Sequence, residues 1–144
     1  MEKTPISDLL RSVLSAACQL LGWSEIVPDH DGNVTWMASV DGTDLPCGII
    51  TFLDRHYIYY YVGISAIEET SAQLLALLTG NFLGAAVGGM SMAILPSQTM
   101  VVAGRCIYQE ELTAQRLSHH LNEGVAVALA WHGRLATKAR MPSE

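Results

Sequence analysis

The spacing of apolar residues at the start of the chain predicts a helix. Apolar residues recur there at every third or fourth position, which places them on one stripe of a helix. They are Ile6, Leu9, Leu10, Val13, Leu14, Ala17, Leu20 and Leu21. Thr4 and Pro5 suit the N-cap and the first helical position, and Gly22 suits a left-handed cap after the last turn. We therefore expect an amphipathic helix that ends at Gly22.

The pattern changes from a helical period to alternation after the turn residues Pro28–Gly32. Apolar and polar residues alternate from Asn33 to Val40, as they do in a half-buried strand. Two further runs, Leu45–Leu53 and Tyr57–Val62, each follow a short turn signal. Three strands joined by short turns predict an antiparallel meander.

A second helix and a second hairpin are predicted next. Ser65-Ala66-Ile67-Glu68 matches a capping box, so we expect a helix from there to about Phe82. Its apolar residues cover more of the circumference than one buried stripe needs, which indicates packing on two sides, one of them against a partner subunit. They are Ile67, Leu74, Leu75, Leu77, Leu78, Phe82 and Leu83. The runs Met90–Leu95 and Met100–Tyr108 then predict a hairpin.

A last helix completes the predicted fold, with apolar residues from Leu117 to Leu135 and a basic end. The predicted order is α-β-β-β-α-β-β-α. This order favours an α+β fold in which helices pack on a twisted antiparallel sheet. Because no repeat or linker divides the chain, we expect a single domain over residues 1–144, with residues 1–4 and 138–144 frayed.

Composition and charge exclude several classes of protein. Half of the residues are hydrophobic and 15% are charged, which excludes a disordered chain and a coiled coil. The formal net charge is -6 and no basic cluster is present, so nucleic acid is not an expected partner. The stretch from Thr70 to Gly104 has no charged residue or histidine, but glycines and Pro96 divide it into pieces too short to span a membrane. We interpret it as core and subunit interface.

Cysteine usage and the N-terminus favour a cytoplasmic protein. The three cysteines, Cys18, Cys47 and Cys106, are far apart and lack metal-ligand spacing, so we interpret them as reduced core residues. The first helix contains Asp8 and Arg11, whereas a secretory signal needs an uninterrupted apolar stretch.

No catalytic, cofactor or metal motif is present in the sequence. The glycines between Gly80 and Gly89 lack the order of a phosphate or dinucleotide loop. His119 and His120, with Glu123 nearby, form no HExxH pair, and adjacent side chains on a helix point about 100° apart. We therefore expect no enzyme and no cofactor. One enzyme or ligand-binding hypothesis stays open, in which turn carboxylates act with His30 or His56. Those carboxylates belong to Asp29, Asp31, Asp41, Asp44 and Asp54.

The predicted strands carry more aromatic and apolar residues than a small acidic domain needs for its core. Since neighbours on a strand point to opposite faces, Trp36 and Met37 cannot both face the helices, and neither can Tyr59 and Tyr60. One face of the sheet is therefore a candidate surface for binding apolar segments. The alternative is a tyrosine-rich strand whose hydroxyl groups lie in water.

The element order, the acidity and one sequence stretch together resemble a known family. The stretch is Leu74-Leu75-Ala76-Leu77-Leu78-Thr79-Gly80-Asn81-Phe82-Leu83-Gly84, followed by Gly88-Gly89. From about Ile6 to Leu135 the chain resembles a class I type III secretion chaperone of the Tir-chaperone family. The resemblance implies a cytoplasmic homodimer that binds the N-terminal segment of a secreted effector protein and keeps it unfolded until export. It implies no catalysis.

The resemblance also implies which residues make the contacts. The dimer interface would contain Leu74, Leu77, Leu78, Phe82, Met90 and Met92. The client would add a strand to a sheet edge and place apolar side chains in shallow patches. For these patches we predict Trp36, Met37, Ile50, Phe52 and Tyr60. The negative net charge favours a client with basic residues. The alternative function is a regulatory or adaptor module of the same fold that binds a folded partner protein.

Overall fold

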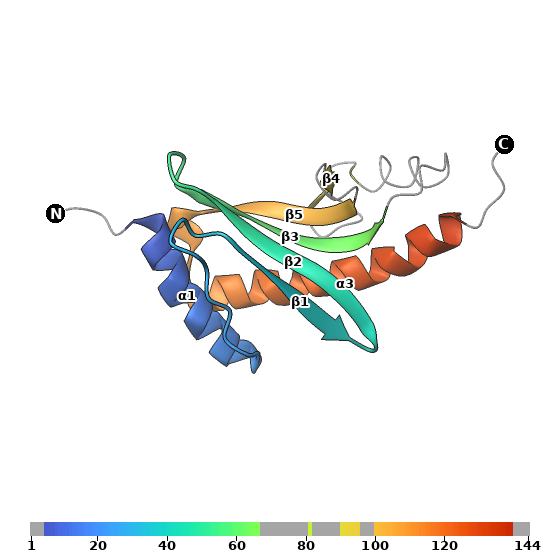
Figure 1. Cartoon of the computed structure of the whole chain (residues 1–144), viewed down its shortest axis with the longest axis horizontal. Helices are drawn as coiled ribbons and strands as arrows, with labels where there is room; N and C mark the ends of the chain where they lie inside the picture. The colour runs from blue at the N-terminus through green and yellow to red at the C-terminus, as the bar shows by residue number, and fades with distance from the viewer. Residues whose placement is uncertain (1–4, 67–80, 82–89, 96–99, 140–144) are drawn as a thin grey trace.

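In the part of the chain that the structure describes, a five-stranded antiparallel sheet carries two α-helices on one face. The computed structural model describes residues 5–66, 81, 90–95 and 100–139. Figure 1 shows helices α1 and α3 crossing beneath the sheet. The elements are α1 (Ile6–Leu21), β1 (Val34–Val40), β2 (Thr43–Phe52), β3 (Tyr57–Ala66), β4 (Ser91–Leu95), β5 (Met100–Tyr108), the short 3-10 helix η2 (Gln109–Glu111) and α3 (Ala114–Ala139). The strand order is β1-β2-β3-β5-β4.

These elements confirm the predicted α+β fold and its order. The predicted second helix lies outside the described residues. Ser65 and Ala66, however, were expected to begin that helix and instead belong to β3, where they pair with Val101 and Met100. The strand includes Ser65 and Ala66 because its pairing with β5 continues through a bulge after Gly63.

Helix α1 is amphipathic and ends where the sequence predicts. Its buried residues are Ile6, Leu10, Leu14, Ala17 and Cys18. The cap residue at its N-terminus is Pro5, one position later than predicted, and no side chain caps the helix there. Gly22 adopts φ 70°, a left-handed conformation that glycine takes without strain, and its N–H bonds the last turn. The chain therefore leaves the helix in an extended segment that leads toward β1.

The polar turn before β1 has a structural role. The Asp29 carboxylate accepts hydrogen bonds from the backbone N–H groups of Asp31 and Asn33, both at 2.9 Å. The bond from Asn33 is the main reason that the pKa of Asp29 lies below its usual value. The Asn33 side chain in turn accepts the N–H of Thr51 at 3.0 Å. This turn thus fixes the start of β1 beside the end of β2.

The core lies between the helices and the inner face of the sheet. Tyr60 is fully buried there, and its hydroxyl donates to the Leu121 carbonyl of α3 at 2.9 Å. Cys18 and Cys47 are also buried, as predicted, and burial raises the pKa of the Cys47 thiol to about 12. The prediction that Cys106 is a core residue is wrong, because it lies exposed on the outer face of β5.

The outer face of the sheet carries tyrosines that cover glycines. A Cβ at Gly48 would collide with the Tyr61 ring, and one at Gly104 would collide with Tyr59. The two tyrosine rings stack at 6.2 Å, and burial raises the pKa of both hydroxyls. A ring that fills the space above a glycine is a means of stabilising a sheet. These tyrosines are therefore partly a second, outer layer of packing.

Candidate functional site

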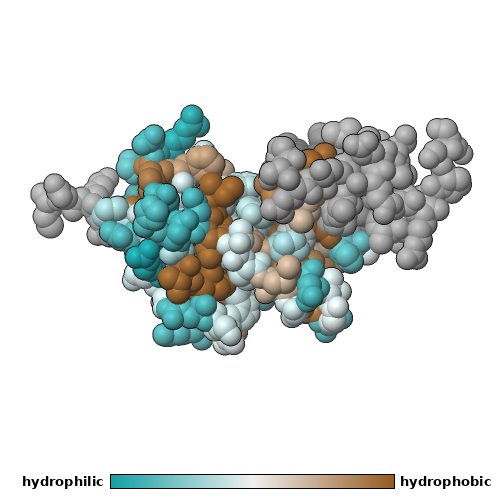
Figure 2. All heavy atoms as spheres, in the orientation of Figure 1, coloured by the Kyte–Doolittle hydropathy of each residue, from teal (hydrophilic) through white to brown (hydrophobic). Residues whose placement is uncertain are grey.

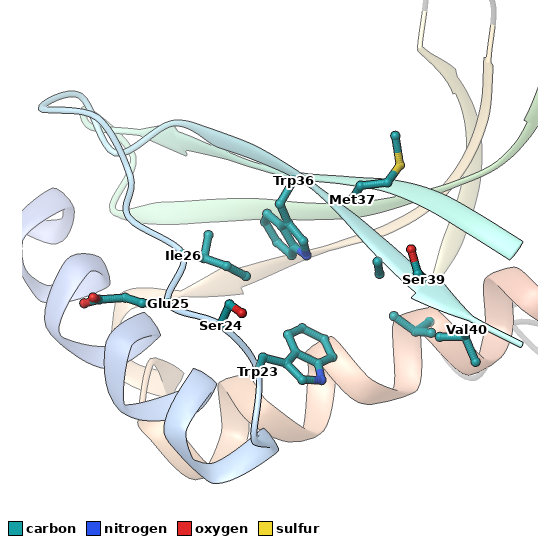
Figure 3. Close-up of a pocket in the computed structure, with 10 residues that line it drawn as sticks. Trp23, Ser24, Glu25, Ile26, Trp36, Met37, Ser39 and Val40 are labelled. Carbon is teal, nitrogen blue, oxygen red and sulfur yellow. The ribbon is translucent and has the colours of Figure 1, made fainter. Parts of the chain in front are cut away.

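A pocket of about 450 Å³ opens beside the edge strand β1. The extended segment after α1 forms one wall, β1 forms the other, and α3 contributes Val125. It is lined by Trp23, Ser24, Glu25, Ile26, Trp36, Met37, Ala38, Ser39, Val40 and Val125. Figure 3 shows the rings of Trp23 and Trp36 pointing into the space between the two walls. In Figure 2, apolar side chains form a band over the part of the molecule that holds α1 and the following segment.

Trp36 lies against the core and leaves one polar group unpaired. Its ring is stacked parallel to the ring of Tyr60, with the centroids 6.2 Å apart and an interplanar angle of 5°. The indole Nε1 is buried and has no hydrogen-bond partner among the described residues. An unpaired buried donor costs about 1–3 kcal/mol, so an acceptor that reached this nitrogen would contribute favourably to binding. The pocket is thus lined mainly by apolar side chains, with Ser24, Glu25 and Ser39 among them.

The pocket opens along β1, an edge strand of the described sheet. Strand β1 is the first in the sheet order, so β2 is its only neighbour among the described strands. Asp41 and Gly42 have φ 52° and 78° between the paired residues Val40 and Thr43, which is a two-residue hairpin turn. The two residues that flank such a turn form both backbone hydrogen bonds with each other. Along the strand from there, residues bonded to the neighbouring strand alternate with residues whose backbone groups point away from it. The backbone groups of Thr35, Met37 and Ser39 therefore point away from β2.

The other edge of the sheet is occupied at one position. The Asn81 side-chain amide donates to the Met92 carbonyl at 2.7 Å and accepts the Met92 N–H at 2.5 Å. Met92 belongs to β4, the last strand of the sheet, and an amide side chain takes the place that a neighbouring strand would take. The edge of β1 is therefore the better candidate for an added strand.

The structure divides the predicted client-binding residues among three places. Trp36 and Met37 line the pocket, although Met37 points outward and is 60% exposed. Ile50 and Phe52 lie on the outer face of β2, where Phe52 contacts Tyr57 at 4.9 Å between ring centroids. Tyr60 is buried in the core and supports the ring of Trp36. The predicted set therefore does not form one surface.

The pocket residues Trp23, Ile26, Val40 and Val125 were absent from the predicted set. Trp23 and Ile26 follow the helix in a segment without helical or strand periodicity, so the pattern gave them no role. One signal in the sequence could have identified Trp23, which is a large aromatic residue directly after the helix-ending Gly22.

Two of the predicted dimer-interface residues are described. Met90 and Met92 are buried within the protomer, at 1% and 5% exposure. The other four, Leu74, Leu77, Leu78 and Phe82, lie outside the described residues.

A second group of polar side chains gathers where β5 meets α3, around Arg105 and His120. The Arg105 Nη1 donates to His120 Nδ1 at 2.7 Å, and His119 Nε2 lies 3.0 Å from Glu123 Oε2. Burial, followed by the charge of Arg105, holds the pKa of His120 below its usual value. Within the described part of the chain, no group of three or more His, Cys, Asp or Glu side chains could hold a metal ion.

The turn carboxylates are also separated. Asp41 and Asp44 lie at the β1–β2 turn, whereas Asp54 and His56 lie at the opposite end of β2. Of the carboxylates in the hypothesis, Asp31 lies 3.4 Å from His30, but both side chains are largely exposed, so this pair forms no enclosed site. Among the described helices, none is both long and apolar enough to cross a membrane.

Comparison with known proteins gives structural matches only. No family model and no curated protein matches the chain. The fold is similar to that of a chain in the crystal structure of the ExsC–ExsE complex, with a TM-score of 0.76, 13% identity, and 92% of this chain and 97% of that chain covered. It is also similar to the fold of a chain in the HopA1–SchA chaperone–effector complex, with a TM-score of 0.66 and 15% identity. This match covers 93% of this chain and 98% of that chain.

A third match is the crystal structure of the Yersinia pestis type III secretion chaperone SycH in complex with a stable fragment of YscM2. Its TM-score is 0.61 at 16% identity, with 84% of this chain and 98% of that chain covered. Identities this low establish a likeness of fold. The chain therefore has the α+β fold seen in type III secretion chaperones.

Proposed function

We propose that the protein is a type III secretion chaperone of the class I, Tir-chaperone type. It binds the N-terminal segment of an effector protein and keeps it unfolded and soluble in the cytoplasm until export. The observation that supports the proposal is the pocket along β1, the edge strand of the described sheet, on a fold shared with chaperones in complexes with effectors or protein fragments. The proposal includes a homodimer and no catalytic step.

The physical basis is that an extended segment can satisfy its backbone and bury its side chains at one place. Added to β1, it would bond the outward backbone groups of Thr35, Met37 and Ser39. Alternate side chains would then enter the pocket between Trp23 and Trp36. A segment of this kind loses chain entropy on binding, so it needs both the hydrogen bonds and the apolar contact.

The test is co-expression with an effector encoded beside the gene, divided into its N-terminal segment and its folded remainder. We expect the full chain to co-purify with the N-terminal segment alone and to keep it soluble. Met37→Pro should abolish this capture, because proline removes an outward N–H while leaving the β1–β2 hydrogen bonds in place. Met37→Ala is the matched control, since it removes the same side chain and retains the N–H.

Two results would contradict the proposal. Capture of the folded remainder without the N-terminal segment would favour the adaptor hypothesis. Equal capture by Met37→Pro and by the unaltered protein would exclude the β1 edge as the binding site. Circular dichroism of both variants establishes that they are folded before capture is compared.

A further inference from the structure

The stretch of chain that forms both walls of the pocket is acidic as well as apolar. Between Arg11 and Arg55 the sequence contains no lysine or arginine, and both walls of the pocket come from this stretch. The acidic residues within it are Glu25, Asp29, Asp31, Asp41, Asp44 and Asp54. Arg11 is engaged elsewhere, since it donates to the carbonyls of Pro28 and Asp29 at 3.3 and 3.2 Å. The local field therefore favours a positively charged ligand.

The acidic groups are not spread evenly around the edge of β1. Glu25 points toward α1, where its carboxylate accepts the Ser15 hydroxyl at 3.2 Å. The carboxylate of Asp44 instead lies beside β1, because it accepts the Ser39 hydroxyl at 2.5 Å across the β1–β2 pair. Ser39 and Asp44 are opposite one another in the register and share the outer face of the sheet with Met37.

We propose that the segment bound at the β1 edge alternates apolar and basic residues, with the apolar side chains in the pocket beside Trp36 and a basic one on the outer face beside Asp44. This inference rests on the proposed function and specifies the chemistry of the client. The alternation follows from the strand period, because successive side chains of an added strand point to opposite faces.

The spacing of the sheet makes the contact with Asp44 possible. An added strand would lie ~4.8 Å from β1 and twice that from β2. A lysine or arginine side chain on the outer face spans this distance to the Asp44 carboxylate, whereas a glutamate at the same place would be repelled. On the inner face the same segment would meet the rings of Trp23 and Trp36.

The experiment uses the full chain and three synthetic peptides of equal length, which alternate leucine with lysine, with glutamine or with glutamate. Fluorescence anisotropy measures the affinity of each peptide at low and at high salt. We expect the lysine peptide to bind tighter than the glutamine peptide by a factor of about 1.5 to 5 for each exposed ion pair, and the glutamate peptide to bind weakest. High salt should reduce the differences.

Two variants locate the effect. Asp44→Asn keeps an acceptor for Ser39 and removes the charge, so it should abolish the lysine preference. Asp54→Asn makes the same change in net charge at the opposite end of β2 and should retain the preference. An equal loss in both variants would overturn the inference, because the preference would then reflect net charge alone.

The remaining outcomes separate the inference from the proposed function. If the lysine and glutamate peptides bind equally and Met37→Pro abolishes both, the alternation is wrong and the β1 edge remains the binding site. If none of the three peptides binds, the inference and the proposed site are both overturned.

Discussion

Gly124 determines how closely α3 approaches the sheet. A Cβ at this position would lie 2.8 Å from both Cε1 and the hydroxyl oxygen of Tyr60, whose ring is fully buried and cannot move aside. Gly133, in the same helix, would place a Cβ in open space. Substitution of alanine should therefore lower the stability at Gly124 and raise it at Gly133.

We predict that Gly124→Ala destabilises the protein by about 1–3 kcal/mol through overpacking, in spite of the better helix propensity of alanine. Gly133→Ala should stabilise it by up to about 1 kcal/mol, since only the propensity term remains. Urea unfolding followed by circular dichroism measures both. A stabilised Gly124→Ala variant would show that the core yields around Tyr60.

Individual positions also show what a sequence pattern can predict. Alternation correctly placed Trp36 and Met37 on opposite faces of β1. It could not show that Tyr60 bonds Leu121 in a helix far along the chain, and so Tyr60 was assigned to a surface when it belongs to the core. Patterns report which face a side chain is on, but the partner across the core determines whether it is accessible.

At the scale of elements, α3 contacts the sheet through a titratable group. His120 accepts a hydrogen bond from Arg105 of β5, which requires an unprotonated Nδ1. Burial and the positive charge of Arg105 both lower the pKa of His120, while Glu123 and Glu111 oppose the shift. The unfolded chain therefore takes up a proton at this residue at higher pH than the folded chain does.

We predict that the free energy of unfolding falls as the pH drops below the ordinary histidine value of 6.5. Above that pH the contribution of His120 is fully present, and it is lost as protonation favours the unfolded chain. His120→Gln should flatten this part of the pH profile, measured by urea unfolding at a series of pH values. His119→Gln is the control on the neighbouring exposed residue, and an unchanged slope in His120→Gln would contradict the prediction.

The elements themselves were largely predictable, because each has a period or a turn that the chain encodes locally. The hairpin at Asp41–Gly42 and the cap at Gly22 lie where the sequence predicts them. The end of β3 was not predictable in this way, since Ser65 and Ala66 match a helix cap locally and are held in the sheet by pairing with β5. Long-range pairing overrode the local signal.

At the scale of the whole molecule, the prediction concerns the oligomeric state. The apolar residues predicted for 67–83 indicate packing on two sides, and we predict a homodimer. Light scattering coupled to size exclusion should give twice the 15.6 kDa of one chain. Leu78→Asp should yield the single-chain mass, because it would bury an unpaired charge in the interface. A dimer that persists in this variant would place the interface elsewhere.

The pocket was the least predictable part of the molecule. It combines the segment after α1, the strand β1 and one residue of α3, which are brought together only by the packing of both helices beneath the sheet. Trp36 and Met37 could be proposed as binding residues because they are bulky neighbours on a strand. Val125 could not, since its helical pattern does not point to β1, and the one signal for Trp23 is its place directly after Gly22.

The Asn81 amide on Met92 has a consequence for self-association. A sheet whose two edge strands are both unpaired can pair edge to edge with further molecules and so grow into fibrils. Here a second molecule that approached β4 would first have to displace a side chain that already satisfies the Met92 backbone. Edge-to-edge polymerisation through β4 is thereby disfavoured. This would suit a protein that binds an unfolded, aggregation-prone client without starting aggregation itself.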